Sequence, residues 1–410
     1  MSENADAIAK WGFTEFVQNG VKNANVYEDV PRLEGTSDAV IRVDGRELVN
    51  FGSCAFLGIQ NDPGVLEHFK NATDRYGIVV GGSRATQGVS LAHKDLEGLL
   101  AQATGMQSAI TFGSGMLANV GFVTAMGAKL SMGKDTSVNN TDTVFVLDRY
   151  SHWSLFRAVE HLRFGQTLFT FKHNDAKHLD EQLKRLAGRK VVVVFESVYS
   201  ADGSVAPVGD ILDACERHGA VSYIDDANGF FVYGTDDRPY AQEYRDMRRA
   251  DFVMVSFSKA IGLEGGGIAG SADAIHAFDV LSGTSMFTAA MQPPTASTAA
   301  YIMRTLMNDH SIVDGYLAQV AKFRTGLEEI GCTISPTPTY IISVFIGHDS
   351  TAERVRQEFI NRGFLIPVIR YPAVKRNEAV MRLMPYGRHT GEQVDNFLQT
   401  LAEVKSEYGF

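Results

Sequence analysis

Short apolar runs alternate with amphipathic segments through the middle of the chain, and this pattern predicts strands followed by helices. The predicted strands are QSAITF (107–112), TVFVLD (143–148), QTLFTFK (166–172), VVVVFES (191–197), VSYIDD (221–226) and DFVMVSFS (251–258). Amphipathic segments begin near Gly115, His152 and Asp175. VVVVFES is continuous and β-branched, as is typical of a strand buried on both faces. We predict a doubly wound, mostly parallel α/β sheet, whose ligands lie at the carboxyl ends of its strands.

The two ends of the chain differ from this central pattern. Residues 1 to about 35 are predicted to form a polar, helical arm, and residues 39–51 a β-hairpin with Asp-Gly at its turn. A stretch rich in Gly, Pro and Thr at 282–296 marks a break. Beyond it, the predicted helices are 297–330, 351–362 and 390–406, and the predicted strands are 339–346, 364–369 and 380–385. We therefore predict three parts, which are an arm with a hairpin at 1–55, a large α/β domain at 56–295, and a smaller C-terminal α+β domain at 296–410.

Composition narrows the class of protein. The chain has 410 residues and a formal net charge of −10, with no run of Lys or Arg, so nucleic-acid binding is not expected. Three widely spaced cysteines, Cys54, Cys215 and Cys332, predict neither a disulfide framework nor a metal site and suit a reducing compartment. No targeting peptide or membrane span is predicted. These features together predict a soluble, cytoplasmic protein.

Lys259 lies between a predicted strand and a turn crowded with glycine, in VMVSFSKAIGLEGGGIAG (253–270). A lysine at the end of a buried strand can serve as a Schiff-base amine, because burial favours its neutral, nucleophilic form. An isolated Ser-Lys-Ala would be better explained by a surface lysine at a strand end. Four other motifs decide between these interpretations.

FGSGMLAN (112–119) is a glycine-rich turn that opens a helix, where free backbone N–H groups and the helix dipole favour a phosphate. Gly113, Gly115 and Ala118 also satisfy the dinucleotide fingerprint, so a nicotinamide-dependent oxidoreductase has to be considered. The next acidic strand end, Asp148, comes later than the spacing of about 20 residues expected for ribose recognition. The fingerprint alone therefore does not decide the cofactor.

Three further strand ends carry polar side chains. His152, in DRYSHWS, can stack on a flat ring or move protons, and it can equally cap a helix. Ser200, in ESVYSADGSVAP, is a candidate hydrogen-bonding group beside a turn that geometry alone explains. Asp225, in YIDDANG, is costly to bury unless a cation such as a protonated heteroaromatic nitrogen meets it. A turn that simply ends the strand is the alternative at Asp225.

One cofactor would use all of these groups. Pyridoxal 5′-phosphate has a phosphate, a ring face, a ring nitrogen and an aldehyde, and each requires one of the groups above. A nicotinamide enzyme would explain the glycines but leave Lys259 and Asp225 without a role. We therefore predict a pyridoxal-phosphate enzyme.

From about residue 45 to its C-terminus, the chain resembles the α-oxoamine synthase family of fold-type-I pyridoxal-phosphate enzymes. The matching segments are AFLGI (55–59), GGSRATQGVSLAHKDLE (81–97), FGSGMLAN, SHWS, ESVYSADGSVAP, SFSKAIGLEGG and RYPAV…RLMPYGRHT (370–390). The ordered set, more than any single match, is specific to the family. The resemblance implies an aspartate aminotransferase-like fold, bound pyridoxal phosphate, and a homodimer whose subunits share their active sites.

The resemblance also implies a role for each matching position. Lys259 would form the Schiff base, His152 would stack on the pyridine ring, and Asp225 would pair with the ring nitrogen. Arg382 would hold the carboxylate of the amino acid, a task that suits a bidentate guanidinium. The other implied cofactor contacts are Gly115 and Met116 at the phosphate, Ser200, Ser256 and, from the neighbouring subunit, Thr288.

Four positions depart from the family pattern. Asn228 replaces a histidine three residues after Asp225; it can donate a hydrogen bond to the phenolic oxygen of the cofactor but cannot titrate near neutral pH. Cys54 replaces an asparagine that helps to hold the substrate carboxylate. Val380 replaces the first arginine of an R-L-R motif, and Glu264 replaces a small residue. These departures bear on the identity of the substrate and on how its carboxylate is bound.

The expected reaction joins an amino acid to an acyl thioester of coenzyme A or a carrier protein, with loss of carbon dioxide, and gives an α-amino ketone. An aminotransferase, aldolase or hydrolase is the alternative that the changes at Asn228 and Cys54 motivate. A catalytically silent partner subunit is a third hypothesis, disfavoured because Lys259, His152 and Asp225 are all present. The amino acid, the acyl length, the carrier and the pathway stay open.

Overall fold

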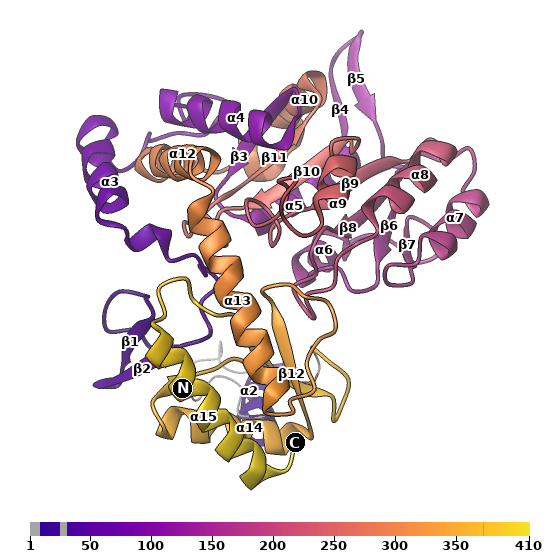
Figure 1. Ribbon diagram of the computed structural model, residues 1–410. Coiled ribbons are helices and arrows are strands. Elements are labelled where there is room, and N and C mark those ends of the chain that lie inside the picture. Colours follow the sequence, from indigo (N-terminus) through magenta and orange to yellow (C-terminus); the bar gives the residue numbers. More distant parts are fainter. Residues whose placement is uncertain (1–8, 25–30, 372) are drawn as a thin grey trace.

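The computed structural model describes residues 9–24, 31–371 and 373–410. Helices flank a large central sheet, and further helices and short strands gather around α13 (Figure 1). The strands are β1 (Val40–Val43), β2 (Arg46–Asn50), β3 (Ser108–Phe112), β4 (Lys129–Gly133), β5 (Thr136–Asn139), β6 (Val144–Asp148), β7 (Leu168–Phe171), β8 (Val191–Glu196), β9 (Val221–Asp225), β10 (Phe252–Ser256), β11 (Gly266–Gly270), β12 (Ile342–Gly347), β13 (Phe364–Leu365), β14 (Val368–Ile369) and β15 (Ala379–Leu383). The helices are α2 (Phe13–Ala24), η1 (Ile59–Asn61), α3 (Pro63–Tyr76), α4 (Leu91–Thr104), α5 (Gly115–Met126), α6 (Trp153–Val159), α7 (Ala176–Arg185), α8 (Val208–His218), α9 (Ala241–Met247), α10 (Ala272–Leu281), α11 (Gly283–Met286), α12 (Pro293–Asn308), α13 (Ser311–Glu329), α14 (Asp349–Asn361) and α15 (Gly391–Tyr408).

The central sheet has the strand order β3-β11-β10-β9-β8-β6-β7. Neighbouring strands from β10 to β7 are parallel, whereas β11 is antiparallel to both of its neighbours. All residues of β8 are buried. Val193 packs in a core that includes α7 and α8, while Val192 and Val194 pack in one that includes α5 and α6. Helices on both faces confirm the predicted doubly wound, mostly parallel sheet.

β11 is a strand where the sequence predicts only a turn crowded with glycine. Glycine is unfavourable in strands, so the hydrophobic pattern of the sequence does not predict β11. A Cβ on Gly266 would lie 2.8 Å from the backbone nitrogen of Gly115, and one on Gly267 would lie 2.4 Å from a methyl carbon of Leu100. The missing side chains let α5 and α4 pack directly against the strand.

Gly266→Ala is therefore expected to lower the free energy of unfolding by about 1–3 kcal/mol, because the new methyl group has no space beside Gly115. Urea unfolding followed by circular dichroism measures the change. The matched control is Gly98→Ala in α4, where nothing lies within 4 Å of the added carbon. That variant should be unchanged or stabilised, by up to about 1 kcal/mol of helix propensity. Equal unfolding midpoints for the two variants would contradict the close approach.

The predicted hairpin forms, with β1 antiparallel to β2. Asp44 and Gly45 have φ values of 49° and 71°, as its two-residue turn requires. β13 adds to β2 in parallel, so this N-terminal hairpin shares a sheet with a strand from near the other end of the chain. The predicted arm is described in part, because its residues 1–8 and 25–30 lie outside the described residues. Within the described part, α2 is helical as predicted. The arm is less polar than predicted, because Trp11 and Phe16 are exposed on it.

Two predicted elements are divided in the structure. The helix predicted at 297–330 is α12 followed by α13, and the break falls where Asp309 accepts the backbone N–H of Ser311 at 2.9 Å. The strand predicted at 364–369 is interrupted before Val368, so that β13 pairs with β2 and β14 pairs with β15. The exposed hairpin of β4 and β5 is not predicted at all (Figure 1).

The division of the chain at residues 55 and 295 stays a prediction. Two sets of contacts cross the proposed boundaries: β2 pairs with β13, and α12 packs against α3 and α4 (Figure 1). Over the described ranges, no helix combines the length and the apolar character needed to span a bilayer.

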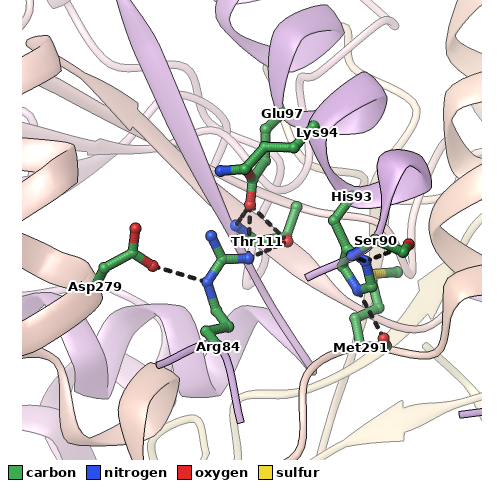
Figure 2. Close-up of polar contacts among 8 residues, drawn as sticks. All are labelled: Arg84, Ser90, His93, Lys94, Glu97, Thr111, Asp279 and Met291. Atoms are coloured by element: carbon green, nitrogen blue, oxygen red, sulfur yellow. Dashed lines mark hydrogen bonds and ion pairs between the residues drawn. The ribbon is translucent and has the colours of Figure 1, made fainter. Parts of the chain in front are cut away.

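A buried polar cluster joins the segment around Arg84 to α4, α10 and β3 (Figure 2). The guanidinium of Arg84 lies 2.7 Å from the Glu97 carboxylate and 2.9 Å from that of Asp279. Glu97 also accepts from the backbone N–H and the hydroxyl of Thr111, at 3.2 and 3.1 Å. The side chains of Arg84 and Glu97 are only 3% and 5% exposed. This cluster fixes three elements at the β3 edge of the sheet.

Two buried histidines are held in the neutral form. His93 donates from Nε2 to the carbonyl oxygen of Met291 at 2.7 Å, and its Nδ1 accepts the backbone N–H of Ser90 (Figure 2). Burial lowers the pKa of His93, and burial lowers the pKa of His389 to about 4. Each ring is therefore a site where acid opposes folding.

We expect the protein to lose stability as pH falls from about 6.5 toward 4, in part through His389. The unfolded chain protonates this residue near its ordinary pKa of 6.5, whereas the folded chain does so only near pH 4, so acid favours unfolding in that window. Thermal midpoints at pH 7, 6 and 5 should fall less steeply in His389→Asn than in the wild type. Burial raises the pKa of Asp226 to about 7, so Asp226 adds stability as the pH falls and acts against His389. The difference between the wild type and His389→Asn therefore isolates the contribution of His389. Parallel pH profiles would contradict the assignment.

Candidate active site

The carboxyl ends of four adjacent strands carry the predicted site residues. Asp225 ends β9, and Ser200 follows β8. His152 follows β6, and Lys259 follows β10. Because β10 pairs with β9, β9 with β8, and β8 with β6, these turns are consecutive along one edge of the sheet. Ligands of parallel α/β sheets bind at this edge.

Asp225 is a buried carboxylate, 3% exposed. One oxygen accepts the backbone N–H of Ala227 at 3.1 Å, and the other accepts the side-chain amide of Asn119 at 3.2 Å. Burial raises the pKa of Asp225, and this rise is opposed by the nearby His152 and Lys259 and by the two hydrogen bonds. The site therefore holds a carboxylate that gains from any further cationic partner.

His152 caps the N-terminus of α6, which is one of the two roles that the sequence suggests for it. Its Nδ1 accepts the backbone N–H of Ser154 at 3.2 Å and lies 2.8 Å from the hydroxyl of the same residue. The residue is exposed to solvent, yet partial desolvation lowers its pKa; Asp225 raises it, while Lys259 and Arg382 lower it further. A neutral ring with Nδ1 as acceptor carries its proton on Nε2. Capping fixes the ring beside the charged groups of the site.

Lys259 lies three residues beyond the end of β10 and is half-buried, not fully buried as the sequence predicts. The chain has already left the sheet here, which accounts for the difference. Among the residues that the structure describes, none forms a hydrogen bond or ion pair with its ammonium group. Its charge acts on both His152 and Asp225. The amine is therefore available to a ligand that lies between these side chains.

The N-terminus of α5 lies against the end of β10. The hydroxyl of Ser114 caps the helix by accepting a backbone N–H of its first turn at 3.1 Å. A Cβ on Gly115 would lie 3.1 Å from the Cβ of Ser256, so glycine permits this approach. The first N–H groups of a helix have no partner within it, which leaves those of Gly115 and Met116 for a phosphate.

Arg382 reaches the same place from β15. Its Nη1 donates to the carbonyl oxygen of Ser200 at 3.1 Å. Its Nε is buried without a hydrogen-bond partner, and no carboxylate in the described ranges forms an ion pair with it. A guanidinium with unused donors fits a ligand that carries a carboxylate.

Two of the departures from the family pattern lie near Tyr340. The hydroxyl of Tyr340 donates to the backbone carbonyl of Asn228 at 2.9 Å, and Cys54 lies close enough to contribute to the pKa of Tyr340, which burial raises well above its usual value. The side-chain amide of Asn228 donates to the carbonyl of Val198 at 3.2 Å. The second N–H of that amide stays available to a ligand.

Thr288 and Glu264, unlike Asn228, are exposed to solvent. Thr288 follows Phe287, which is 82% exposed, and the next residue, Ala289, pairs with Ser83. This exposed position is compatible with a contact made across a subunit interface.

Sequence reasoning missed Asn119 and Glu196. The amide of Asn119 donates to the hydroxyl of Ser154 at 2.9 Å as well as to Asp225, and its carbonyl oxygen accepts the hydroxyl of Tyr223 at 2.6 Å. Asn119 lies four residues after Gly115, so the two residues are on the same face of α5. This spacing can be read from the sequence. Glu196 is 2% exposed, and only the sheet register reveals that it is paired with Asp225.

A separate cavity of about 740 Å³ lies at the ends of α4 and α12 beside α9. Its lining includes Asp226, Phe230 and Tyr244 but none of the predicted site residues. We place the candidate active site at the strand ends, because the amine, the imidazole, the carboxylate and the guanidinium converge there.

Known proteins resemble this chain over nearly its whole length. Residues 46–401 match the family described as Aminotransferase class I and II. An 8-amino-7-oxononanoate synthase from Alcanivorax borkumensis is 33% identical over 381 residues, which cover 93% of this chain and 95% of the relative. A serine palmitoyltransferase from Bacteriovorax stolpii is 30% identical over 389 residues, which cover 94% and 89% respectively. The solved serine palmitoyltransferase from Sphingomonas wittichii aligns with a TM-score of 0.86 at 25% identity, covering 97% of this chain and 98% of that one.

Proposed function

The chain belongs to the class I and II aminotransferase family, within its α-oxoamine synthase branch, and we propose that its active site is the group of side chains at the carboxyl ends of β6, β8, β9 and β10. The protein is a pyridoxal-phosphate-dependent C-acyltransferase that joins an amino acid to an acyl thioester with loss of carbon dioxide. The observation that carries the placement of the site is the convergence of Lys259, His152 and Asp225, which follow or end neighbouring strands at one edge of the sheet.

The residues present fit pyridoxal phosphate. The unused N–H groups of Gly115 and Met116 would hold its phosphate, and the buried carboxylate of Asp225 would hold the proton of its ring nitrogen. The remaining proposed contacts are His152 on the ring face, Lys259 at the aldehyde, and Ser200, Ser256 and Asn228 around the ring. When bound, pyridoxal phosphate supplies a conjugated ring that absorbs the charge left on the α-carbon of the amino acid.

Lys259 is the proposed base that takes the α-proton of the amino acid. Its amine has no competing partner among the described residues, and His152 and Asp225 flank it. Arg382 would bind the carboxylate of the amino acid through Nε and its other free donors, which directs the α-proton toward Lys259. Fixing both substrates in this orientation removes much of the entropic barrier to a condensation.

We also propose a homodimer in which Thr288 of one subunit contacts the phosphate bound by the other. The exposed apolar side chains of Ile78, Val79 and Phe287, near the pairing of Ser83 with Ala289, support a surface that a second copy covers. A cytoplasmic location is proposed on the basis of the three free cysteines.

Product analysis tests the reaction. The protein is incubated with pyridoxal phosphate, a ¹³C-labelled amino acid and a panel of acyl thioesters, starting with serine and palmitoyl-coenzyme A. One product should contain both carbon skeletons, and carbon dioxide should appear in equal amount. A product that keeps only the carbon skeleton of the amino acid, such as an oxo acid, would instead identify an aminotransferase, aldolase or hydrolase.

A further inference from the structure

His173 lies just beyond β7, the edge strand of the central sheet, and contacts two turns of the candidate site. β7 pairs with β6, and β6 pairs with β8, so a side chain from this segment has to cross the end of β6 to reach the turn after β8. The side chain of His173 makes this crossing and is only 19% exposed. Its contacts on either side of β6 define what it can hold together.

Each ring nitrogen of His173 has a polar partner in a different turn. Nδ1 lies 3.0 Å from Oδ1 of Asp148, the buried residue that ends β6. Because a carboxylate only accepts hydrogen bonds, Nδ1 is the donor. Nε2 lies 2.9 Å from the hydroxyl of Ser204, in the turn after β8. One imidazole therefore connects the two turns by hydrogen bonds.

Aromatic side chains from the same two turns pack against this ring. Tyr150, after β6, stacks on the ring of His173 with the centroids 4.3 Å apart and an angle of 14° between the planes. Tyr199, after β8, meets it edge-on at 4.4 Å and 89°. Stacked and edge-to-face pairs at such separations are favourable. The orientation of the imidazole is therefore fixed by packing as well as by hydrogen bonds.

The next residue, Asn174, joins the same two turns. Its backbone N–H donates to Oδ2 of Asp148 at 2.9 Å, and its side-chain amide donates to the carbonyl oxygen of Val205 at 3.1 Å. Its φ of 53° lies in the left-handed region, which asparagine tolerates better than most residues. These contacts hold the backbone of the segment where the side chain of His173 can reach both turns.

Both turns carry groups of the proposed site. The turn at 148–152 presents the imidazole of His152 at the start of α6. The turn at 197–205 presents the carbonyl oxygen of Ser200, to which Arg382 donates at 3.1 Å. A shift of one turn against the other would therefore move the proposed ring-stacking imidazole relative to the proposed carboxylate-binding guanidinium.

We propose that His173 is a positioning residue that holds the turn carrying His152 against the turn carrying Ser200, through its hydrogen bonds to Asp148 and Ser204. This inference rests on the proposed function for its effect on the cofactor, but the joining of the two turns is a property of the chain itself. His173 takes no part in the proposed proton transfer.

Two single variants act on this connection from opposite ends. His173→Phe keeps an aromatic ring between the two tyrosines but removes both hydrogen bonds. Ser204→Ala removes only the partner in the turn after β8, together with a 2.7 Å hydrogen bond to Asp202 within that turn. The matched control is His161→Ala, which removes an exposed histidine just after α6.

The first measurement is hydrogen exchange of the full-length protein without added cofactor. Peptides covering 149–155 and 199–203 should both exchange about tenfold faster in His173→Phe, and at the wild-type rate in His161→Ala. A peptide covering 91–104, in α4 at the opposite edge of the sheet, should be unchanged. Unchanged exchange in either turn would overturn the proposal, and so would an equal acceleration in α4, which would indicate a general loosening.

Ser204→Ala keeps the proposal falsifiable if His173→Phe does not fold. The substitution changes a side chain after β8, yet it should speed the exchange of 149–155, after β6, by about threefold or more, because the lost hydrogen bond crosses between the turns. Acceleration confined to the peptide covering 199–203 would overturn the proposal.

The second measurement is the dissociation constant of pyridoxal phosphate, obtained from absorbance titrations. His173→Phe should raise it about tenfold and Ser204→Ala about threefold. Because the two side chains act through one shared hydrogen bond, the double variant should bind about tenfold more weakly than the wild type, not about thirtyfold. Unchanged binding in His173→Phe, or a thirtyfold loss in the double variant, would overturn the positioning role.

One result would count against the proposed function and not against this inference. If the wild-type protein fails to form an absorbance band that Lys259→Ala lacks, the proposed function is refuted. The exchange experiment, which needs no cofactor, would still decide whether His173 joins the two turns.

Discussion

Lys259→Ala is expected to lower kcat/KM by about a thousandfold or more while leaving the fold intact, because the variant loses both the amine that bonds to the cofactor and the base that takes the α-proton. The half-buried side chain forms no hydrogen bond or ion pair among the described residues, so the circular dichroism spectrum and thermal midpoint should stay close to those of the wild type. Steady-state kinetics with the thioester and amino acid identified by product analysis measure the loss. The same substitution should abolish the absorbance change that a lysine-linked pyridoxal phosphate produces.

The control for this experiment is Lys70→Ala, which removes a lysine that is 72% exposed in α3 and is paired with Glu67 at the surface. Its kinetics should match the wild type. A Lys259→Ala protein that forms product at the wild-type rate would remove Lys259 from the mechanism and, with it, the placement of the active site.

Arg84→Met is expected to lower the free energy of unfolding by about 3–5 kcal/mol, because it leaves the buried carboxylate of Glu97 without the guanidinium that compensates its charge. Among the described residues, only Lys94, at 3.0 Å, and the hydroxyl and N–H of Thr111 would remain as partners of that carboxylate. Urea unfolding followed by circular dichroism and by tryptophan fluorescence measures the loss.

The matched control is Arg157→Met, since Arg157 and its partner Glu160 are 53% and 59% exposed. An exposed pair of this kind contributes at most about 1 kcal/mol. The double variant Arg84→Met/Glu97→Met should recover much of the loss, because no unpaired charge stays buried. If Arg84→Met were no more destabilised than Arg157→Met, the cluster would have no special role in holding α4 and α10 to the sheet.

Much of the fold follows from hydrophobic periodicity, and the exceptions have physical causes. The β-branched run at 191–197 could be predicted as a central strand because both of its faces are apolar. The strand at 266–270 could not, because it begins with two glycines, which leave space where α4 and α5 approach. The single helix predicted at 297–330 is two helices, since the apolar periodicity does not mark the break at Asp309, where α12 ends and the Asp309 carboxylate accepts the backbone N–H of Ser311. Which sheet the segment 364–369 joins depends on partners distant in the sequence, and local patterns do not contain that information.

The candidate site was predictable where residue chemistry is distinctive, and not where function depends on register. Lys259, His152 and Asp225 could be proposed because a cofactor accounts for all three together. Glu196 could not, because its place beside Asp225 is visible only in the register of the sheet. The spacing of Asn119 on α5 is visible in the sequence, but its partners are not, since its amide joins Ser154 and Asp225, which are far apart in the sequence.

The pairing of the N-terminal hairpin with β13 bears on the order in which this chain can fold during its synthesis. A ribosome releases β1 and β2 first, but β13 emerges only after most of the chain has been made. Until then the backbone N–H of Val49, which donates to Gly363 at 2.8 Å in the folded protein, belongs to an unpaired strand edge that other chains can pair with. The sheet of β1, β2 and β13 can therefore close only at the end of translation, and a nascent chain gains from protection of this edge until that moment.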